Sequence, residues 1–188
     1  KITKLVQGQL ADPIIEVGPG TGSLTGELLK DNYRIKAIEI DRKLAEILNE
    51  RFIDVPNLEI FNEDAMEFDY TQLQGPWWIF VSNLPYNIGT RLLVKLITEV
   101  PVIHRYVVMV QKEVGERIVA NPGGKEYGAL SVLFKLFTES KIQFDVSKNC
   151  FYPPPKVTSS VLTIQRETIL DEDCLLYTSD AADDVLWG

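Results

Sequence analysis

The feature that most constrains the fold is an alternation of short apolar runs with amphipathic segments along most of the chain. Short runs rich in Ile, Val and Phe indicate buried strands, whereas longer segments with apolar residues three and four positions apart indicate helices. The expected strands are 13–17, 34–40, 57–61, 77–81 and 105–110, and the expected helices are 24–30, 43–52, 88–100, 112–120 and 130–137. Because strands and helices alternate, we predict an α/β fold with a doubly wound parallel sheet.

The end of this pattern contains two more strand-like runs with no helix between them. They are Lys141–Val146 and Thr158–Gln165, and the loop Tyr152–Pro155 that joins them holds three consecutive prolines. Proline lacks an N–H group and is therefore confined to loops and sheet edges. We predict that the two runs pair antiparallel at one edge, which gives a mostly parallel sheet of seven strands with an antiparallel edge strand.

The net charge of −8 at first argues against a nucleic acid partner, because phosphate binding requires a basic surface. From Glu167 onward, however, there are seven acidic residues and no Lys or Arg, so residues 1–166 carry a net charge of only −1. A nearly neutral body is compatible with RNA binding but gives no positive evidence for it.

Residue counts also exclude several classes of protein. Two cysteines, Cys150 and Cys174, are too few for a disulfide framework or a zinc site, and the single histidine, His104, is expected at the surface before the fifth strand. No apolar run approaches the roughly 20 residues that span a bilayer, and no signal peptide is evident. We expect a cytoplasmic monomer without metal.

Both ends of the chain look incomplete or foreign. Ile2, Leu5, Val6 and Leu10 form an apolar stripe that indicates the middle of a helix, so we expect a segment to precede it. Cys174–Gly188 has no periodicity and resembles the read-through of a cloning adapter. We therefore predict one domain over residues 1–166, followed by an acidic tail, 167–188, with a non-native end.

A glycine-rich turn follows the first expected strand, where an α/β sheet binds its ligand. The segment Glu16–Gly22 has the spacing G-x-G-x-G, and Ser23 occupies the place of the third glycine of a dinucleotide fingerprint. Gly18 and Gly20 allow the backbone to approach a ligand closely. The turn predicts a nucleotide-like ligand and disfavours NAD, and we expect Glu16 among the contacts of that ligand.

Two acidic residues follow the next two strands. Glu39, with Ile40, ends the second strand, and its carboxylate can accept both hydroxyls of a ribose. Asp64, with Ala65, follows the third strand and can accept an adenine amino group. The structural alternatives are a solvated strand end for Glu39 and a turn or helix cap for Asp64. Together with the glycine turn, these acids favour S-adenosyl-L-methionine as cofactor.

The tetrapeptide Asn83-Leu84-Pro85-Tyr86 comes directly after the fourth strand. The Asn83 side-chain oxygen and the Leu84 carbonyl can accept the two hydrogens of an adenine N6 amine, which points the nitrogen lone pair at a methyl donor. Pro85 stiffens the turn, and Tyr86 offers a face on which the base can stack. The alternative is an ordinary strand-to-helix connection with Tyr86 packed inward.

A third element lies between the last two strands. Its rigid prolines can hold Phe151 as a second wall of a base pocket opposite Tyr86, and Lys156 can meet a phosphate. The alternative is an edge loop whose aromatic residues cap the core.

Between about Asp12 and Arg166 the chain resembles the ribosomal RNA adenine dimethyltransferases. The resemblance rests on motifs in a specific order and spacing: E-V-G-P-G-T-G-S-L-T, I-E-I-D, E-D-A-M, N-L-P-Y-N-I, Q-K-E-V, Y-G-A-L-S-V and F-Y-P-P-P-K-V-T-S-S-V. It implies a Rossmann-like class I methyltransferase fold, an adenine site at Asn83–Tyr86 and Phe151, and a cofactor site at Gly18, Gly20, Glu39 and Asp64. It also implies dimethylation of two adjacent adenines near the 3′ end of small-subunit ribosomal RNA.

By the same resemblance, a cofactor-binding segment before the first strand and a helical RNA-binding domain after the last are missing. Alternatives stay open at this point. Related enzymes methylate an adenine of large-subunit RNA and confer macrolide resistance, and other relatives act in transcription. A cofactor-binding assembly factor without turnover is also compatible. The residue Leu84 disfavours a DNA methyltransferase, and Ser23 disfavours a nicotinamide oxidoreductase.

Overall fold

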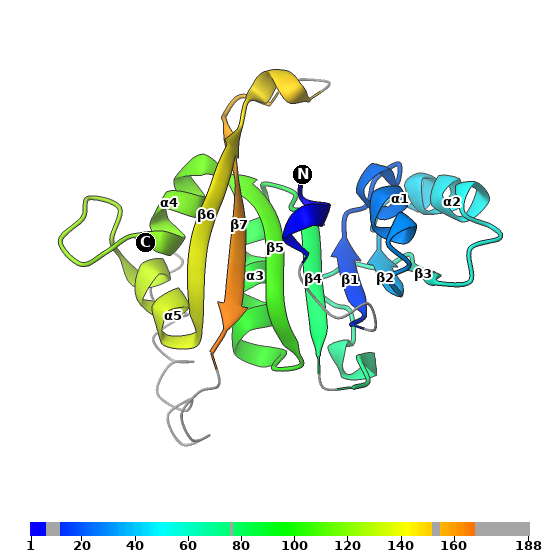
Figure 1. Ribbon diagram of the computed structural model, residues 1–188, viewed down its shortest axis with the longest axis horizontal. Helices are drawn as coiled ribbons and strands as arrows, with labels where there is room; N and C mark the ends of the chain where they lie inside the picture. The colour runs from blue at the N-terminus through cyan, green and yellow to red at the C-terminus, as the bar shows by residue number, and fades with distance from the viewer. Residues whose placement is uncertain (7–11, 76, 152–154, 168–188) are drawn as a thin grey trace.

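The structure, a computed structural model, describes residues 1–6, 12–75, 77–151 and 155–167. These residues form a seven-stranded sheet with the order β3-β2-β1-β4-β5-β7-β6 (Figure 1). Strand pairing shows that all neighbours are parallel except those of β7, which is antiparallel to β5 and β6. The strands are β1 (Ile14–Val17), β2 (Ile35–Ile38), β3 (Leu58–Phe61), β4 (Trp78–Asn83), β5 (Ile103–Gln111), β6 (Thr138–Val146) and β7 (Ser159–Arg166).

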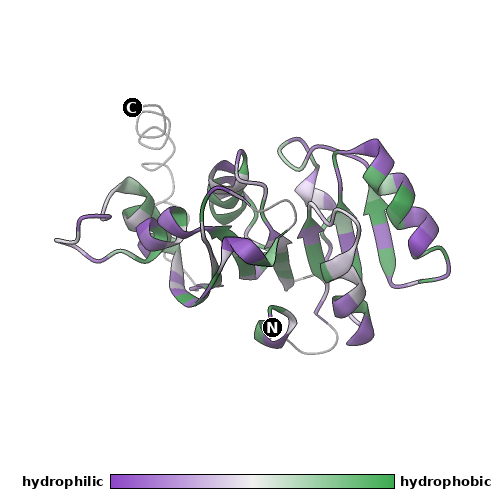
Figure 2. Ribbon diagram, turned by 90° about the horizontal axis from the view of Figure 1, so that it is seen from above, coloured by the Kyte–Doolittle hydropathy of each residue, from purple (hydrophilic) through white to green (hydrophobic). Residues whose placement is uncertain are grey.

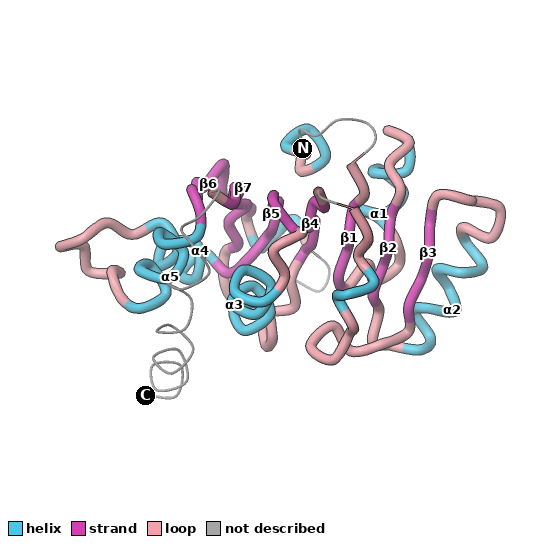
Figure 3. Tube along the Cα trace, turned by 90° about the horizontal axis from the view of Figure 1, so that it is seen from below, coloured by secondary structure: helices cyan, strands magenta, loops and turns pink. Residues whose placement is uncertain are grey.

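Helices cover both faces of this sheet, as the alternating pattern predicts. They are α1 (Ser23–Lys30), α2 (Arg42–Arg51), α3 (Gly89–Glu99), α4 (Lys112–Val119) and α5 (Ala129–Phe137), with 3-10 helices at Thr3–Leu5, Tyr70–Gln72 and Lys148–Cys150. One buried cluster joins β1, β2 and β4 to α1 and the N-terminal 3-10 helix, and a second joins β4, β5 and β7 to α3, α4 and α5. Figure 3 shows the N-terminal turn and α3 on opposite sides of the sheet.

Local sequence explains where individual helices begin. Asp41 has extended backbone geometry, and its carboxylate accepts hydrogen bonds from the N–H groups of Lys43 and Leu44, at 2.8 and 3.2 Å, which caps the first turn of α2. Ala45 and Leu48 then place apolar side chains on the buried face. The cap and the apolar stripe together fix the start and the orientation of α2.

An arginine at the C-terminal end of β7 binds carbonyl groups of α3 and β5. Arg166, the last residue of β7, donates from Nε to the carbonyl of Ile103 at 3.0 Å and from Nη2 to the carbonyl of Ile97 at 2.9 Å. The same nitrogen lies 3.3 Å from the carbonyl of Leu96. A cation at the C-terminal end of a helix satisfies free carbonyl groups and favours the helix dipole.

The predicted element order and the antiparallel pair at one edge are confirmed. Within that pair, β7 is the antiparallel strand and β6 forms the edge itself. Strand β4 extends two residues beyond the predicted end at Val81, because the Ser82 hydroxyl donates to the Val17 carbonyl at 2.6 Å and is thereby satisfied in the buried sheet. Asn83 is therefore the last residue of β4, whereas the sequence pattern predicted it directly after the strand.

Two other expectations require correction. His104 lies within β5 and is only partly exposed, since its ring packs edge-on against Trp77 with 4.8 Å between ring centroids. Burial lowers its pKa. The opening segment forms a 3-10 helix over Thr3–Leu5, and Leu10, the last residue of the predicted stripe, lies outside the described residues.

Hydrophobic residues are concentrated in the strands and on the helix faces that meet the sheet (Figure 2). Within the described ranges, no helix is both long enough and apolar enough to cross a membrane. The predicted domain boundary falls after Arg166, where β7 ends. Apart from Glu167, the predicted acidic tail lies outside the part of the chain that the structure describes.

Candidate active site

The predicted site residues gather at one edge of the sheet. Strands β1, β2, β3 and β4 are parallel, so the segments that follow them emerge at the same edge, the upper one in Figure 1. The hairpin of β6 and β7 projects beyond that edge, and the 3-10 helix Lys148–Cys150 lies at its tip. The topology therefore explains how segments far apart in the sequence contribute to one site.

The glycine turn needs glycine for two different reasons. Gly18, Gly20 and Gly22 all have positive φ angles, of 66°, 60° and 80°, which side chains disfavour. A Cβ at Gly22 would lie 2.6 Å from Phe52 and 2.7 Å from Leu48, so this glycine also allows α1 to pack against α2. At Gly20 no heavy atom lies within 4 Å of an added Cβ, so this part of the turn is open to a ligand.

Glu39 ties the turn to the end of β2. Its side chain is 5% exposed, and its two carboxylate oxygens accept hydrogen bonds from the N–H groups of Gly20 and Asp41, both at 3.0 Å. The alternative of a solvated strand end is therefore wrong. Each carboxylate oxygen can accept a further hydrogen bond, and the adjacent Ile40 is 67% exposed beside this carboxylate.

Glu16 is a buried acid with incomplete hydrogen bonding. It is 1% exposed, and its Oε2 has no hydrogen-bond partner among the described residues. Burial raises the pKa of Glu16 from 4.5 to about 7, the Thr25 hydroxyl opposes this rise, and the negative charge of Glu39 adds to it. Because Oε2 is buried without a partner among the described residues, a cation or hydrogen-bond donor placed next to it would stabilise the Glu16 carboxylate.

Asp64 forms a turn cap, as the structural alternative expected. Its Oδ1 accepts a hydrogen bond from the Met66 N–H group at 2.8 Å, and its carbonyl accepts from Phe68 at 2.9 Å. Ala65, which follows, is buried. A cap uses one carboxylate oxygen, so the role of Asp64 and Ala65 in cofactor binding stays a prediction.

Asn62 is a residue of this site that the sequence reasoning missed. Its amide nitrogen donates to the carbonyls of Glu39 and Ile40, at 2.8 and 3.2 Å, and so holds the loop after β3 against the loop after β2. A single exposed asparagine after a strand carries no signal that distinguishes it from an ordinary turn residue.

The loop after β4 lies against the glycine turn. A Cβ at Gly18 would lie 3.5 Å from the Pro85 ring, which is ordinary contact distance. Leu84 is buried and donates its N–H to the Met109 carbonyl at 3.1 Å, whereas Asn83 is exposed. The Gly89 N–H at the start of α3 bonds the Pro85 carbonyl at 2.9 Å, so this loop is also a strand-to-helix connection.

The two aromatic residues predicted to hold a base, Tyr86 and Phe151, have different surroundings. Tyr86 is 39% exposed, and its hydroxyl lies 2.7 Å from the Ser159 hydroxyl. Phe151 is partly buried at the end of the 3-10 helix, and Lys156 is exposed. Residues 152–154 of the proline loop lie outside the described residues, so the opposition of Phe151 and Tyr86 stays a prediction.

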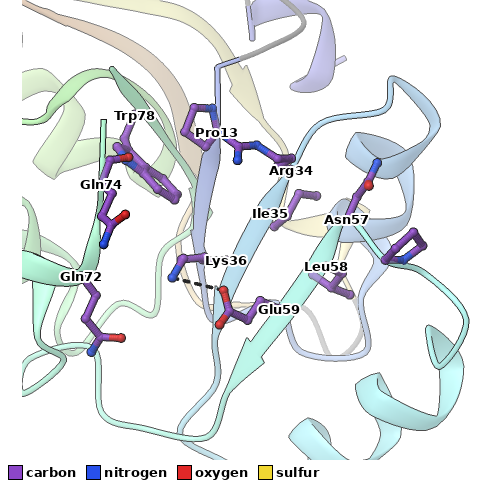
Figure 4. Close-up of a pocket in the computed structure, with 11 residues that line it drawn as sticks. Pro13, Arg34, Ile35, Lys36, Asn57, Leu58, Glu59, Gln72, Gln74 and Trp78 are labelled. Carbon is purple, nitrogen blue, oxygen red and sulfur yellow. Dashed lines mark hydrogen bonds and ion pairs between the residues drawn. The ribbon is translucent and has the colours of Figure 1, made fainter. Parts of the chain in front are cut away.

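A large hollow lies at the opposite edge of the sheet. It has a volume of about 570 Å³ and lies near the amino ends of β1 to β4, where Gln72, Gln74 and Trp78 face an ion pair of 3.1 Å between Lys36 and Glu59 (Figure 4). It is separate from the glycine turn and the Asn83–Tyr86 loop. Among the described residues, no group of three or more His, Cys, Asp or Glu side chains could hold a metal ion.

Comparison with known proteins gives one family and a consistent set of relatives. The family described as Ribosomal RNA adenine dimethylase matches residues 1–179. Ribosomal RNA small subunit methyltransferase A of Thermotoga maritima is 44% identical over 169 residues, which make up 90% of this chain and 59% of that protein. The protein of the same name from Methylococcus capsulatus is 44% identical over 155 residues, or 82% of this chain and 60% of that protein.

Two solved structures resemble this one closely. A dimethyladenosine transferase from Plasmodium falciparum has a TM-score of 0.79 at 29% identity and covers 96% of this chain and 63% of its own. The 23S rRNA methyltransferase ErmE has a TM-score of 0.81 at 27% identity, with 97% and 73% covered. These matches confirm the predicted methyltransferase fold. The chain spans about six tenths of the length of the curated relatives named above.

Proposed function

Since the chain belongs to the ribosomal RNA adenine dimethylase family, we propose that it transfers methyl groups from S-adenosyl-L-methionine to adenine N6 atoms of small-subunit ribosomal RNA. The observation that carries this proposal is the close approach of the glycine turn to the Asn83–Tyr86 loop, where a Cβ at Gly18 would lie 3.5 Å from the Pro85 ring. It brings a candidate cofactor loop next to a candidate base loop. The 44% identity to small subunit methyltransferase A supports the choice of substrate.

The residues of the glycine turn fit the proposed cofactor. Glu39 would accept the ribose hydroxyls, the open space at Gly20 would admit the methionine portion, and the unpartnered oxygen of Glu16 would meet its ammonium group. Ile40, exposed beside Glu39, and the Asp64–Ala65 turn would contact the adenine ring. When bound, the cofactor supplies a methyl group activated by a sulfonium.

The end of β4 and the loop after it would orient the target amine. The Asn83 side-chain oxygen and the Leu84 carbonyl would accept the two N6 hydrogens, and both would stabilise positive charge that develops on nitrogen. Tyr86 and Phe151 would stack on the base. The buried Leu84 side chain and its N–H bond to Met109 support this role, because they hold the backbone of the loop in place.

The distribution of charge supports an RNA partner. Residues 1–102 contain ten Lys and Arg against 15 Asp and Glu, whereas residues 103–166 contain nine against five. The half of the domain built from β5 to β7 is therefore basic, and the half that would hold the cofactor is acidic. A phosphate backbone favours the basic half. We propose that the protein acts as a monomer on ribosomal RNA in the cytoplasm.

A second candidate substrate is an adenine of large-subunit RNA. The TM-score of 0.81 to a 23S rRNA methyltransferase supports it. The same loops would serve either substrate, so the RNA must be tested directly.

The test is transfer of labelled methyl groups from S-adenosyl-L-methionine to undermethylated small subunits and, in parallel, to large-subunit RNA, followed by nucleoside analysis. Dimethyladenosine in small-subunit RNA is the expected product. Product in large-subunit RNA alone would select the second candidate. No transfer to either RNA, with cofactor binding verified by calorimetry, would reject the enzymatic proposal.

Two substitutions separate the proposed roles. Asn83→Ala should lower the transfer rate roughly 100-fold or more and leave cofactor affinity nearly unchanged, because Asn83 is exposed at the end of β4. Glu39→Ala should instead weaken cofactor binding by about 10- to 100-fold, since it removes a charged hydrogen-bond acceptor. Loss of cofactor binding in Asn83→Ala would contradict its assigned role.

A further inference from the structure

The structure links the Asn83–Tyr86 loop to a strand that lies far away in the sequence. The hydroxyl groups of Tyr86 and Ser159, 73 residues apart, are separated by 2.7 Å. Ser159 is completely buried, whereas Tyr86 is 39% exposed. The tip of the tyrosine is therefore anchored while part of its surface stays accessible.

The anchor point is rigid. Ser159 is the first residue of β7 and pairs with Gln111 of β5 on one side and with Val146 of β6 on the other. The preceding carbonyl, of Thr158, accepts a hydrogen bond from the Lys112 N–H at 2.9 Å. Neighbouring strands thus hold the Ser159 backbone on both sides, and complete burial restricts the positions that its hydroxyl can take.

A hydroxyl with restricted positions changes what the Tyr86 ring can do. A tyrosine on a loop samples several rotamers, and a stacking partner must stop that motion when it binds. Anchoring the phenol in the free protein removes this cost and leaves the ring ready to stack. Ring stacking on a base contributes about 1–3 kcal/mol, but only in the correct orientation does it place N6 near Asn83.

We propose that Ser159 is a positioning residue that, through the Tyr86 hydroxyl, holds the Tyr86 ring as a preformed platform for the target adenine. This inference rests on the proposed methyl transfer. It also explains why the platform is tyrosine, since phenylalanine would offer the same face without the anchor. Ser159 acts through Tyr86 and does not itself touch the base.

The test is a double-mutant cycle with Ser159→Ala, Tyr86→Phe and the combined variant, measured by methyl transfer. Each single change removes one hydrogen bond and should lower kcat at saturating RNA about five- to tenfold, with cofactor affinity unchanged. The combined variant should be no slower than either single variant, because both remove the same interaction. A merely structural role would lower the melting temperature without this coupling in kcat.

Ser160→Ala is the matched control. Ser160 is the next residue and equally buried, but its hydroxyl donates to Asp145 at 2.7 Å, away from Tyr86. Its removal should leave kcat unchanged. Tyr86→Phe removes the same hydrogen bond from its exposed partner, so this variant tests the proposal without a change in the buried core.

Full kcat in Ser159→Ala, or effects of the two single changes that multiply in the combined variant, would overturn the proposal. Failure of the proposed function gives a different result, which is no transfer by the unmodified protein to either ribosomal RNA.

Discussion

Replacing Glu16 by glutamine should stabilise the folded chain above pH 7 and leave its stability below pH 4.5 almost unchanged. Glu16 is 1% exposed in the middle of β1, and burial raises its pKa from 4.5 to about 7, with the Glu39 carboxylate adding to the rise. Glutamine has nearly the same shape and carries no charge, so it mimics the protonated acid at every pH.

The size and sign of this effect follow from the two pKa values. Below pH 4.5 Glu16 is protonated in both states, and its contribution to stability is fully present. As the pH rises from 4.5 to about 7, the unfolded chain releases the proton while the folded chain retains it, so stability falls. Each pH unit in this window is worth about 1.4 kcal/mol, which gives a total loss of about 3 kcal/mol by pH 8.

The assay is urea denaturation of the unmodified chain and of Glu16→Gln between pH 4 and 8. We expect the difference in unfolding free energy to grow across this window to about 3 kcal/mol, equivalent to a rise in melting temperature of about 6–12 °C at pH 8. Glu50→Gln, which removes an exposed carboxylate from α2, is the control and should change stability by less than about 0.5 kcal/mol. A difference that does not vary with pH would refute this reasoning.

Two further predictions concern residues that hold the fold around the site. Gly22→Ala should destabilise the protein by about 3 kcal/mol, because a side chain there adds a clash against Phe52 to the cost of a left-handed backbone conformation. Gly20→Ala should cost only about 1 kcal/mol, since it carries the conformational cost alone. Equal melting temperatures of the two variants would contradict this difference. Arg166→Met should lower the free energy of unfolding by about 2 kcal/mol, because it leaves carbonyl groups at the end of α3 without a partner. An unchanged midpoint of urea denaturation would contradict this and show that water replaces the guanidinium.

Much of the fold could be predicted because it depends on local patterns. Apolar periodicity identified the seven strands and five α-helices of the described residues but not the 3-10 helices. The rule that parallel strands end at one edge predicted that Gly18, Glu39 and Asn83 would gather there. Element ends were less certain where polar residues continue a strand. Because Ser82 is polar, the apolar pattern predicted that β4 ends at Val81. In the structure the Ser82 hydroxyl donates to the Val17 carbonyl, so the polar residue lies within the buried strand.

Contacts between distant side chains could not be predicted in this way. The pairing of Tyr86 with Ser159 and the amide bonds of Asn62 depend on how loops meet after the sheet has formed. Neither contact leaves a periodic signal in the sequence. The turn cap made by Asp64 was anticipated as an alternative, because aspartate after a strand commonly bonds the backbone two residues ahead.

The position of β7 affects the order in which the chain can fold during synthesis. Among the seven described strands, β7 is the last to leave the ribosome, yet it lies between β5 and β6, and among the described residues β6 pairs with no other strand. Until residue 166 has emerged, β5 has an open hydrogen-bonding edge and β6 has no place in the sheet. The acidic half can assemble early from neighbouring segments, whereas the basic half is completed only by this final, long-range pairing.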